Sequence, residues 1–554
     1  MMCLRKVVPI LFVLFSLYGR ASELPSSPIT KQTIEREQQE RLQLLEQNTQ
    51  SVQSLIPSPT IPEPEQAPES QCFEVRNIQF SGNTIYTDDE LSQAIDFRAG
   101  CIGLNTINEY LRRASNHYLQ AGYVTSRAFL VPQDLSSGTL EIEVLEGKIE
   151  KILLNGSVVD SLLMAFSDVS DHVLNLRDIE QGLDQINRLS RYNAQIKLLP
   201  STRAGYSIVD IQSNIGSLGS IGGSFNNGGQ KSTGEEQVSI DASAENLFNL
   251  FDQWTLSTTH SAAFAHSKNS ESLYLGVDVP YGYWNIGYRT SYSTYKTEFS
   301  NQGFTFDSTG QTNSHDIDIK WLFYRDGVSK SALKTTVSHR REKNFILGTL
   351  LEAGSRNLSS LSFALEHSTR LGNGFLTVSP KVSFGTDWFG GEQNLSSNPN
   401  YPKAQFLKST FSGSYTYPVS SNLSFATTLF GQWSNDTLYA NERVSIGGEY
   451  SVRGFKNTSI SGDEGYYWRN DLTYQLGRWP YLGSVTSRLA LDTGSIAKDS
   501  SDEYERGSMM GSSLGLFTQS QYASSSLSIG VPLAAPSRIN HDDYVIYYRI
   551  NVKI

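Results

Sequence analysis

The chain has 554 residues, which is more than one ordinary domain holds. Charged residues make up 18% of it, below the usual share of about a quarter. The formal net charge of -11 disfavours tight phosphate binding and argues against a nucleic-acid-binding protein. The chain is rich in aromatic residues and glycine, with 28 tyrosines, 26 phenylalanines and 44 glycines, and it does not have the composition of a highly charged disordered protein.

The first residues have the pattern of a secretory signal peptide. Arg5 and Lys6 form a basic start, the apolar run 7–18 follows, and the small residue Ala21 offers a cleavage point. A membrane-anchoring helix is the alternative, but the apolar run is too short to span a bilayer comfortably. We therefore expect residues 1–21 to be removed and the mature chain to be exported.

Two cysteines, Cys72 and Cys101, remain after this cleavage. An even number of cysteines in an exported chain indicates a disulfide bond. The bond would close a loop of roughly 30 residues and contribute about 3 kcal/mol, while two free thiols are the alternative. No Cys-X-X-Cys motif or histidine cluster accompanies the cysteines, and no catalytic motif or phosphate-binding loop is found. The sequence thus predicts no metal, no cofactor and no catalytic residues.

Residues 28–50 predict a helix that is polar on nearly all sides, with i,i+4 ion pairs such as Arg36–Glu40. A helix of this kind does not suit a dry core. Its length of roughly 30 Å matches the hydrocarbon layer of a membrane. Five prolines in residues 51–71 then predict an extended linker that reaches about 60 Å.

Two tandem α+β units follow, over residues 72–148 and 149–213. In the first unit we expect a strand, two helices and two strands in that order. Thr87 and Glu90 form a capping box at the first helix, and Gly122 ends the second. The second unit repeats the same order more briefly, so the sequence predicts a modular arm.

Residues 214–554 change to segments of about ten residues that alternate in polarity, as in "FLTVSPKVSF" at 375–384. We count sixteen such segments, eleven before a long loop at about 435–464 and five after it. This pattern is typical of an antiparallel outer-membrane β-barrel, in which closure pairs every backbone group. Sixteen strands imply a wide, water-filled lumen. A large soluble β-sandwich or a secreted β-helix is the alternative.

Three motifs carry a family resemblance: "SIGGEYSVRGF" at 445–455, "LALDTGSI" at 489–496, and the segment 122–152 across the two α+β units. Together with the barrel pattern they resemble the outer-membrane transporters of two-partner secretion, the TpsB family. That family belongs to the BamA-like barrels that carry POTRA domains. The resemblance covers essentially the whole chain after the signal peptide.

The resemblance implies that the α+β units are POTRA domains 1 and 2, and that helix 28–50 plugs the barrel. It also implies that extracellular loop six folds back into the lumen, where Arg453 pairs with Asp492. The expected site residues lie on loop six and on the barrel wall: Val452, Arg453, Gly454, Phe455, Asp492 and Gly494. The chain departs from the family pattern at Leu489, where an aromatic residue is usual.

The function that the resemblance implies is secretion of a large β-helical exoprotein from the periplasm to the cell surface, without ATP and without enzymatic activity. The exoprotein would be an adhesin, a haemolysin or a contact-dependent inhibition toxin with an N-terminal secretion domain. Other expected partners are outer-membrane lipid with lipopolysaccharide and the barrel-assembly machinery, and the chain is expected to be a monomer. The alternatives are an insertase of the BamA or TamA type, which carries more POTRA domains, and a passive porin or receptor.

Overall fold

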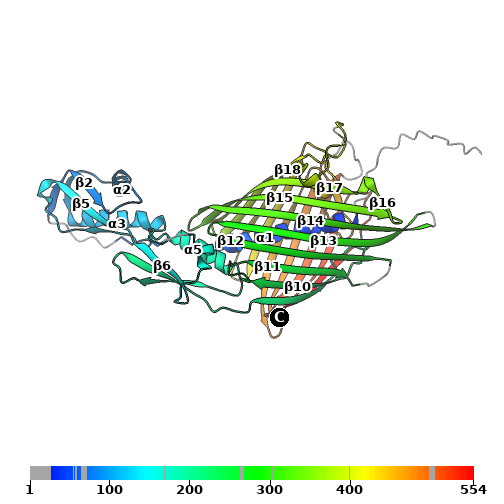
Figure 1. The fold of residues 1–554 in the computed structure, drawn as a ribbon, viewed down its shortest axis with the longest axis horizontal. Coiled ribbons are helices and arrows are strands. Elements are labelled where there is room, and N and C mark those ends of the chain that lie inside the picture. Colours follow the sequence, from blue (N-terminus) through cyan, green and yellow to red (C-terminus); the bar gives the residue numbers. More distant parts are fainter. Residues whose placement is uncertain are drawn as a thin grey trace, which may run out of the picture.

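The computed structural model describes the chain in nine stretches: 27–53, 55, 59–63, 71–167, 170–262, 267–301, 304–398, 400–497 and 506–553. The predicted signal peptide and most of the predicted linker lie outside these residues. Two small α+β domains lead into a large β-barrel, and a helix lies within the barrel (Figure 1). Within the described stretches, no helix is long and apolar enough to cross a membrane.

The barrel is a closed antiparallel sheet in which the last strand pairs with the first. Its short β16 (Thr349–Leu350) only extends one hairpin, which leaves the predicted sixteen wall strands. The wall strands are β9 (Gly219–Asn226), β10 (Gln237–Glu245), β11 (Gln253–Ser261), β12 (Asn269–Tyr281), β13 (Trp284–Asn301), β14 (Phe304–Arg325), β15 (Ser329–Ile346), β17 (Arg356–Leu371), β18 (Gly374–Thr386), β19 (Leu407–Pro418), β20 (Leu423–Ser434), β23 (Gly465–Trp479), β24 (Gly483–Ile496), β25 (Gly507–Gln519), β26 (Ala523–Ala534) and β27 (Val545–Lys553).

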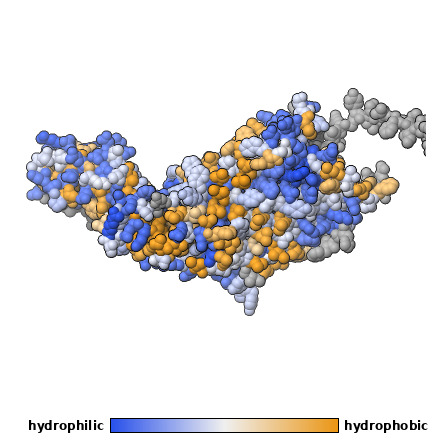
Figure 2. Space-filling model, viewed as in Figure 1, coloured by the Kyte–Doolittle hydropathy of each residue, from blue (hydrophilic) through white to orange (hydrophobic). Residues whose placement is uncertain are grey.

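Alternation along each strand separates the two faces of this wall. On β14, Ile317 and Ile319 are exposed on the outside, while Asp318 lies between them and lines the lumen. Apolar side chains accordingly gather over the middle of the barrel surface (Figure 2). The period-two pattern of the sequence therefore corresponds to apolar residues that face lipid and polar residues that face the lumen.

The first α+β domain has a three-stranded sheet in the order β2-β5-β4, with β5 parallel to β2 and antiparallel to β4. The Cys72–Cys101 disulfide joins a separate pair, β1 and β3. Thr87 and Glu90 form the predicted capping box. The elements are β1 (Cys72–Val75), β2 (Asn77–Ser81), α2 (Asp88–Ala94), β3 (Gly100–Gly103), α3 (Leu104–Gln120), β4 (Arg127–Leu130), η1 (Leu135–Ser137) and β5 (Thr139–Leu145).

The second α+β domain repeats the predicted order of strand, two helices and two strands. Its sheet has the order β6-β8-β7, again with the last strand in the centre. The elements are β6 (Lys148–Leu154), α4 (Leu162–Ala165), α5 (Leu176–Asn187), β7 (Gln195–Pro200) and β8 (Tyr206–Gln212).

The turn between β10 and β11 fixes this second domain to the barrel. Phe251 from that turn is fully buried in the domain's own hydrophobic core, where its ring packs against Tyr192. Arg188 of the domain donates to the backbone carbonyl of Phe251 at 2.6 Å, and Arg325 of the barrel pairs with Asp184 at 2.6 Å. The arm is therefore packed onto the barrel.

The N-terminal helix α1 (Pro28–Gln53) lies inside the barrel, as Figure 1 shows. It is three residues longer at its C-terminal end than the expected 28–50, because Ser51, Val52 and Gln53 continue the helix. Lys330 of the barrel wall donates to the Ser51 carbonyl at 3.1 Å and lies 2.6 Å from Asp184 of the second α+β domain. The end of α1 is thus held where the arm meets the barrel.

Candidate functional site

The long loop between β20 and β23, residues 435–464, is loop six, and it folds back along the inner wall of the barrel. A short antiparallel pair stabilises its base, β21 (Val444–Ile446) with β22 (Ile460–Gly462). The remaining short helical turns of the barrel loops are η2 (Glu352–Gly354), η3 (Trp388–Gly390) and η4 (Ala440–Glu442). Between β21 and β22 the chain makes a tip that contains the Val-Arg-Gly-Phe motif.

Arg453 at this tip lies against Asp492 on β24. Its Nε and Nη2 atoms donate to the two carboxylate oxygens at 2.6 Å and 2.7 Å, and its backbone amide donates to Oδ2 at 3.0 Å. Arg453 is 6% exposed and Asp492 is 1% exposed. Two parallel charge-assisted hydrogen bonds of this kind set both the distance and the orientation of the tip.

Arg453 also contacts a second carboxylate, Asp471 on β23. Its Nη1 atom donates to Oδ1 of Asp471 at 2.6 Å. The sequence analysis did not identify Asp471. Its sequence offers no local signal, because only the pairing of β23 with β24 brings it under the tip. Arg469, two residues earlier on the same face, is directly opposite Asp492 and donates to the Glu449 carbonyl of loop six at 3.1 Å.

Glycines on the wall and on the tip make this close approach feasible. Gly454 has a φ of +102°, and a Cβ there would lie 2.6 Å from the Val531 carbonyl. A Cβ on Gly511 would lie 1.8 Å from the Arg453 carbonyl, and one on Gly530 would lie 2.8 Å from the Gly454 amide. Gly494 leaves room for Val452, whose side chain would be 3.1 Å from an added Cβ. Steric room for Val452 therefore explains why a glycine occupies position 494. The sequence analysis did not identify Gly511 and Gly530.

Apolar packing completes the contact of the tip with the wall. Val452 and Phe455 are fully buried in a cluster of loop and wall residues: Phe430, Val444, Ile446, Ile460, Tyr467, Ile496 and Met509. The Tyr547 hydroxyl of the last strand donates to the Phe455 carbonyl. Leu489, the departure from the family pattern, is 54% exposed on the outer face and so has no part in this packing.

Helix α1 contacts loop six as well as the wall. Gln38 donates to the Ser445 carbonyl of β21 at 2.8 Å. The Arg41 guanidinium lies 3.6 Å from the centre of the Phe430 ring and donates to the Tyr467 hydroxyl at 3.0 Å. Because Phe430 and Tyr467 belong to the cluster around Phe455, the helix and the loop share one set of supporting residues.

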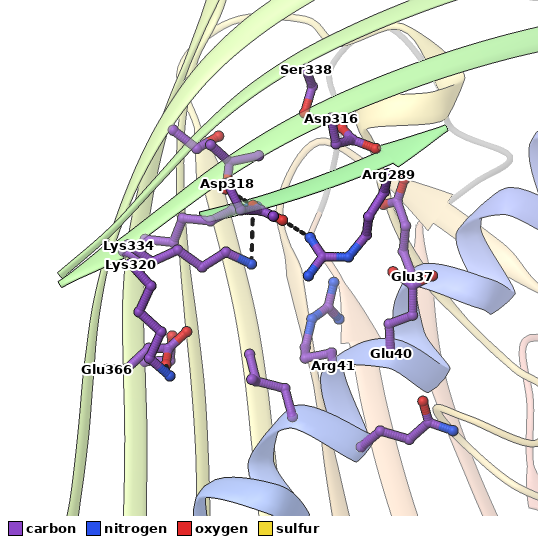
Figure 3. Close-up of a pocket in the computed structure, with 18 of the residues that line it drawn as sticks. Glu37, Glu40, Arg41, Arg289, Asp316, Asp318, Lys320, Lys334, Ser338 and Glu366 are labelled. Carbon is purple, nitrogen blue, oxygen red and sulfur yellow. Dashed lines mark hydrogen bonds and ion pairs between the residues drawn. The ribbon is translucent and has the colours of Figure 1, made fainter. Parts of the chain in front are cut away.

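The lumen around α1 retains a cavity of about 1530 Å³ with a polar, charged lining. Figure 3 shows that wall charges pair with one another there: Asp318 with Lys334 at 3.1 Å and also with Arg289. Lys320 pairs with Glu366 at 2.6 Å on the same wall. An ion pair between Glu37 and Arg340 at 2.9 Å connects the helix to the wall. Most of the wall charge in this view is therefore neutralised without the helix.

The predicted disulfide lies far from this site, in the first α+β domain. No group of three or more histidine, cysteine, aspartate or glutamate residues able to hold a metal occurs in the described part of the chain.

Comparison with known proteins identifies the family of this chain. The family model described as haemolysin secretion/activation protein ShlB/FhaC/HecB matches residues 205–518. A ShlB-type POTRA domain matches residues 73–147, and a further POTRA domain matches residues 148–200. The chain belongs to the ShlB/FhaC/HecB family.

The relatives of this family member carry the names of transporters. The outer membrane transporter CdiB of Dickeya dadantii (strain 3937) is 36% identical over 547 residues, which cover 98% of both chains. The hemolysin transporter protein ShlB of Serratia marcescens is 29% identical over 83% of this chain and 81% of its own length. The solved structure of CdiB from Escherichia coli superposes with a TM-score of 0.93 at 35% identity, over 96% of this chain and all of that one. The chain is thus a two-partner secretion transporter of the outer membrane with periplasmic POTRA domains.

Proposed function

We propose that the chain secretes one large β-helical exoprotein through the lumen that α1 now occupies, and that it does so without ATP. The observation that carries this proposal is the way in which α1 is held. Its contacts with the wall and loop six are mostly polar, and the wall charges around it are paired with one another. A polar helix can leave such a lumen without stranding an unpaired apolar face in water.

The exoprotein is an adhesin, a haemolysin or a contact-dependent inhibition toxin with an N-terminal secretion domain. The POTRA domains capture this domain in an unfolded form. In POTRA 1, strands β2 and β4 form the two edges of the sheet, and an extended segment can add to such an edge through main-chain hydrogen bonds. Folding of the exoprotein at the cell surface then gives the transport its direction.

Arg453 and Asp492 have a positioning role in this proposal, together with Val452, Gly454, Phe455 and Gly494. They hold loop six against the wall, so that the loop leaves a path along the opposite side of the lumen. The chain acts by binding and gating and catalyses no reaction, in keeping with its membership of a transporter family.

The chain works as a monomer in contact with lipopolysaccharide, after insertion by the barrel-assembly machinery. The monomer is supported by closure of the barrel, since β27 pairs with β9 and leaves no open sheet edge for a second copy. We assign recognition by the assembly machinery to Tyr547 and Tyr548 of the last strand, where Tyr548 packs beside Phe225 with ring centroids 5.8 Å apart.

The test compares surface and medium proteins of cells with and without this chain. We expect one very large protein to disappear while other outer-membrane barrels keep their normal levels. A broad fall in barrel proteins would instead identify an insertase and would reject the proposed function.

A further inference from the structure

We propose that the outer wall formed by β14, β15 and β17 carries a binding site for a phosphorylated, acylated glycolipid, the lipid A part of lipopolysaccharide. Arg341 and Lys343 bind its phosphates, and Phe389 packs against its acyl chains. This inference deepens the lipopolysaccharide contact proposed above by assigning residues to it.

The two basic side chains point away from the lumen. On β15, the residues that line the lumen are even-numbered apart from His339, and they include Arg340, which pairs with Glu37 of α1. Odd-numbered residues face outward, as the 39% exposure of Leu333 shows. Arg341 and Lys343 continue this outward row toward the end of the barrel that lies away from the POTRA domains.

Their height on the barrel matches the edge of the membrane. Near the periplasmic end, Trp321 of β14 is stacked on Trp284 and marks one interface. Asn313, the partner of Arg341 in the ladder, lies eight residues further along the same strand. With about 3.4 Å per residue and a strand tilt of about 40°, Arg341 lies about 21 Å and Lys343 about 26 Å above the tryptophans. The apolar band of such barrels is about 25 Å tall, so both cations lie where lipid headgroups begin.

The positive charge at this height is not neutralised by the neighbouring strands. The ladder partners of Arg341 are Asn313 and Asn357, and Lys343 is opposite Gln311. None of these ladder partners carries a charge, and among the described residues neither cation takes part in an ion pair within 4 Å. Two carboxylates near this row are already engaged: Glu392 accepts from the Asn357 backbone amide at 2.8 Å, and Asp307, higher up, pairs with Lys296 at 3.5 Å. An anionic headgroup would therefore meet two available cations.

Aromatic side chains lie beside these cations. Phe389, in the loop after β18, is 68% exposed although its φ of 56° puts it in the left-handed region. Its ring centre is 5.9 Å from that of His339, the outward residue of β15 next to Arg341. Trp388 is 44% exposed in the same turn. The left-handed backbone conformation of Phe389 has an energetic cost, and it exposes an apolar ring. Contacts of this ring with acyl chains at the membrane interface would offset that cost.

Charge and apolar surface thus meet in one place, as a lipid with phosphates on a sugar head and several acyl chains requires. Figure 2 shows this change in character, with the apolar surface of the barrel giving way to hydrophilic surface toward the end away from the POTRA domains. Arginine can grip a phosphate with two hydrogen bonds, and lysine adds a further charge.

The test uses the purified full-length protein in detergent micelles and lipid A that carries two phosphates as the probe. We expect the double variant Arg341→Gln/Lys343→Gln to bind the probe at least about tenfold more weakly than the parent, because charge-assisted hydrogen bonds to both phosphates are lost. The matched control, Arg478→Gln/Lys553→Gln, removes an exposed arginine and lysine at the periplasmic end and should bind like the parent. Both variants must show the shift in gel migration of a folded barrel on heating.

Lipid A with one phosphate supplies the second measurement, on the parent protein alone. Weaker binding of this form is expected, and equal binding of both forms would overturn the proposal. Equal loss in the double variant and the control would overturn it too. Phe389→Ala should weaken both forms alike through lost acyl contacts. Exoprotein secretion is scored separately, so loss of lipid A binding with normal secretion leaves the proposed function standing, and the reverse outcome leaves the lipid site standing.

Discussion

Arg453 meets two carboxylates, and this arrangement makes its role one of positioning more than of stability. A buried ion pair gains little over a well-packed apolar contact, because both charges lose their hydration. Removal of one partner is costly, however, since Asp492 and Asp471 would remain in the wall without their cation. The pair therefore holds the tip of loop six in one place.

We predict that Arg453→Ala leaves the barrel assembled and reduces exoprotein secretion strongly. The loss of the cation should destabilise the docked tip by about 3–5 kcal/mol. Arg453→Lys should retain part of the activity, because lysine keeps the charge but cannot form the two-pronged contact. Secretion is measured against barrel abundance in the outer membrane, with the exposed residue change Arg478→Ala as control. Normal secretion by Arg453→Ala would contradict the positioning role of Arg453.

A separate prediction concerns Gly511, where the absence of a side chain leaves room for the tip of loop six. A Cβ at Gly511 would overlap the Arg453 carbonyl at 1.8 Å, so Gly511→Ala should displace the tip and reduce secretion. Gly223→Ala on β9 is the matched control, because its added Cβ would meet the Ser239 carbonyl at an ordinary 3.6 Å. Protease access to loop six gives the direct measurement. Equal protection of the loop in both variants would contradict the steric argument.

At the scale of elements, α1 and loop six depend on the same residues. Arg41 stacks on Phe430 and Gln38 binds the base of the loop, so movement of the helix removes support from the cluster around Phe455. The helix therefore helps to hold loop six in its docked position as well as occupying the lumen.

We predict that Arg41→Ala raises the open fraction of single barrels in planar bilayers. The substitution removes the stack on Phe430 and the hydrogen bond to Tyr467, which should weaken the seating of α1 by about 1–3 kcal/mol. Gln43→Ala changes an exposed residue of the same helix and should leave the conductance unaltered. If both variants show the open fraction of the parent, Arg41 does not hold α1 in the lumen.

For the whole molecule, the attachment of POTRA 2 to the barrel decides whether client capture can act on the lumen. Phe251 from a barrel turn completes the POTRA 2 core, and Lys330 contacts both α5 of that domain and the end of α1. Lys330 therefore links the arm to the end of α1 through two polar contacts.

We predict that Phe251→Ala releases the arm from the barrel. Truncation of this buried ring should cost about 3–5 kcal/mol at the contact. The linker between β8 and β9 should become sensitive to limited proteolysis, and secretion should fall while the barrel stays folded. Phe248→Ala in the same turn is the control, because Phe248 is 65% exposed. Equal protease resistance of the two variants would show that Phe251 does not fix the arm.

Most of the architecture of this protein follows from patterns along the chain. The period-two alternation gave sixteen wall strands, eleven before loop six and five after, because lipid on one face and water on the other require it. The capping box at Thr87 and the polar character of α1 likewise follow from local chemistry, and the disulfide follows from the even number of cysteines in an exported chain. The expected partners Arg453 and Asp492 came from a family resemblance, and the structure puts them within 2.6 Å of each other.

The further residues that support that pair come together when the barrel closes. Asp471, Gly511 and Gly530 are ordinary strand residues until strand register and barrel closure bring them under loop six. The burial of Phe251 in another domain has no local signal either, since a phenylalanine in a turn reads as an exposed residue. Such contacts join segments that are far apart in the chain, so they depend on closure of the barrel and docking of the arm, and neither leaves a periodic pattern in the sequence.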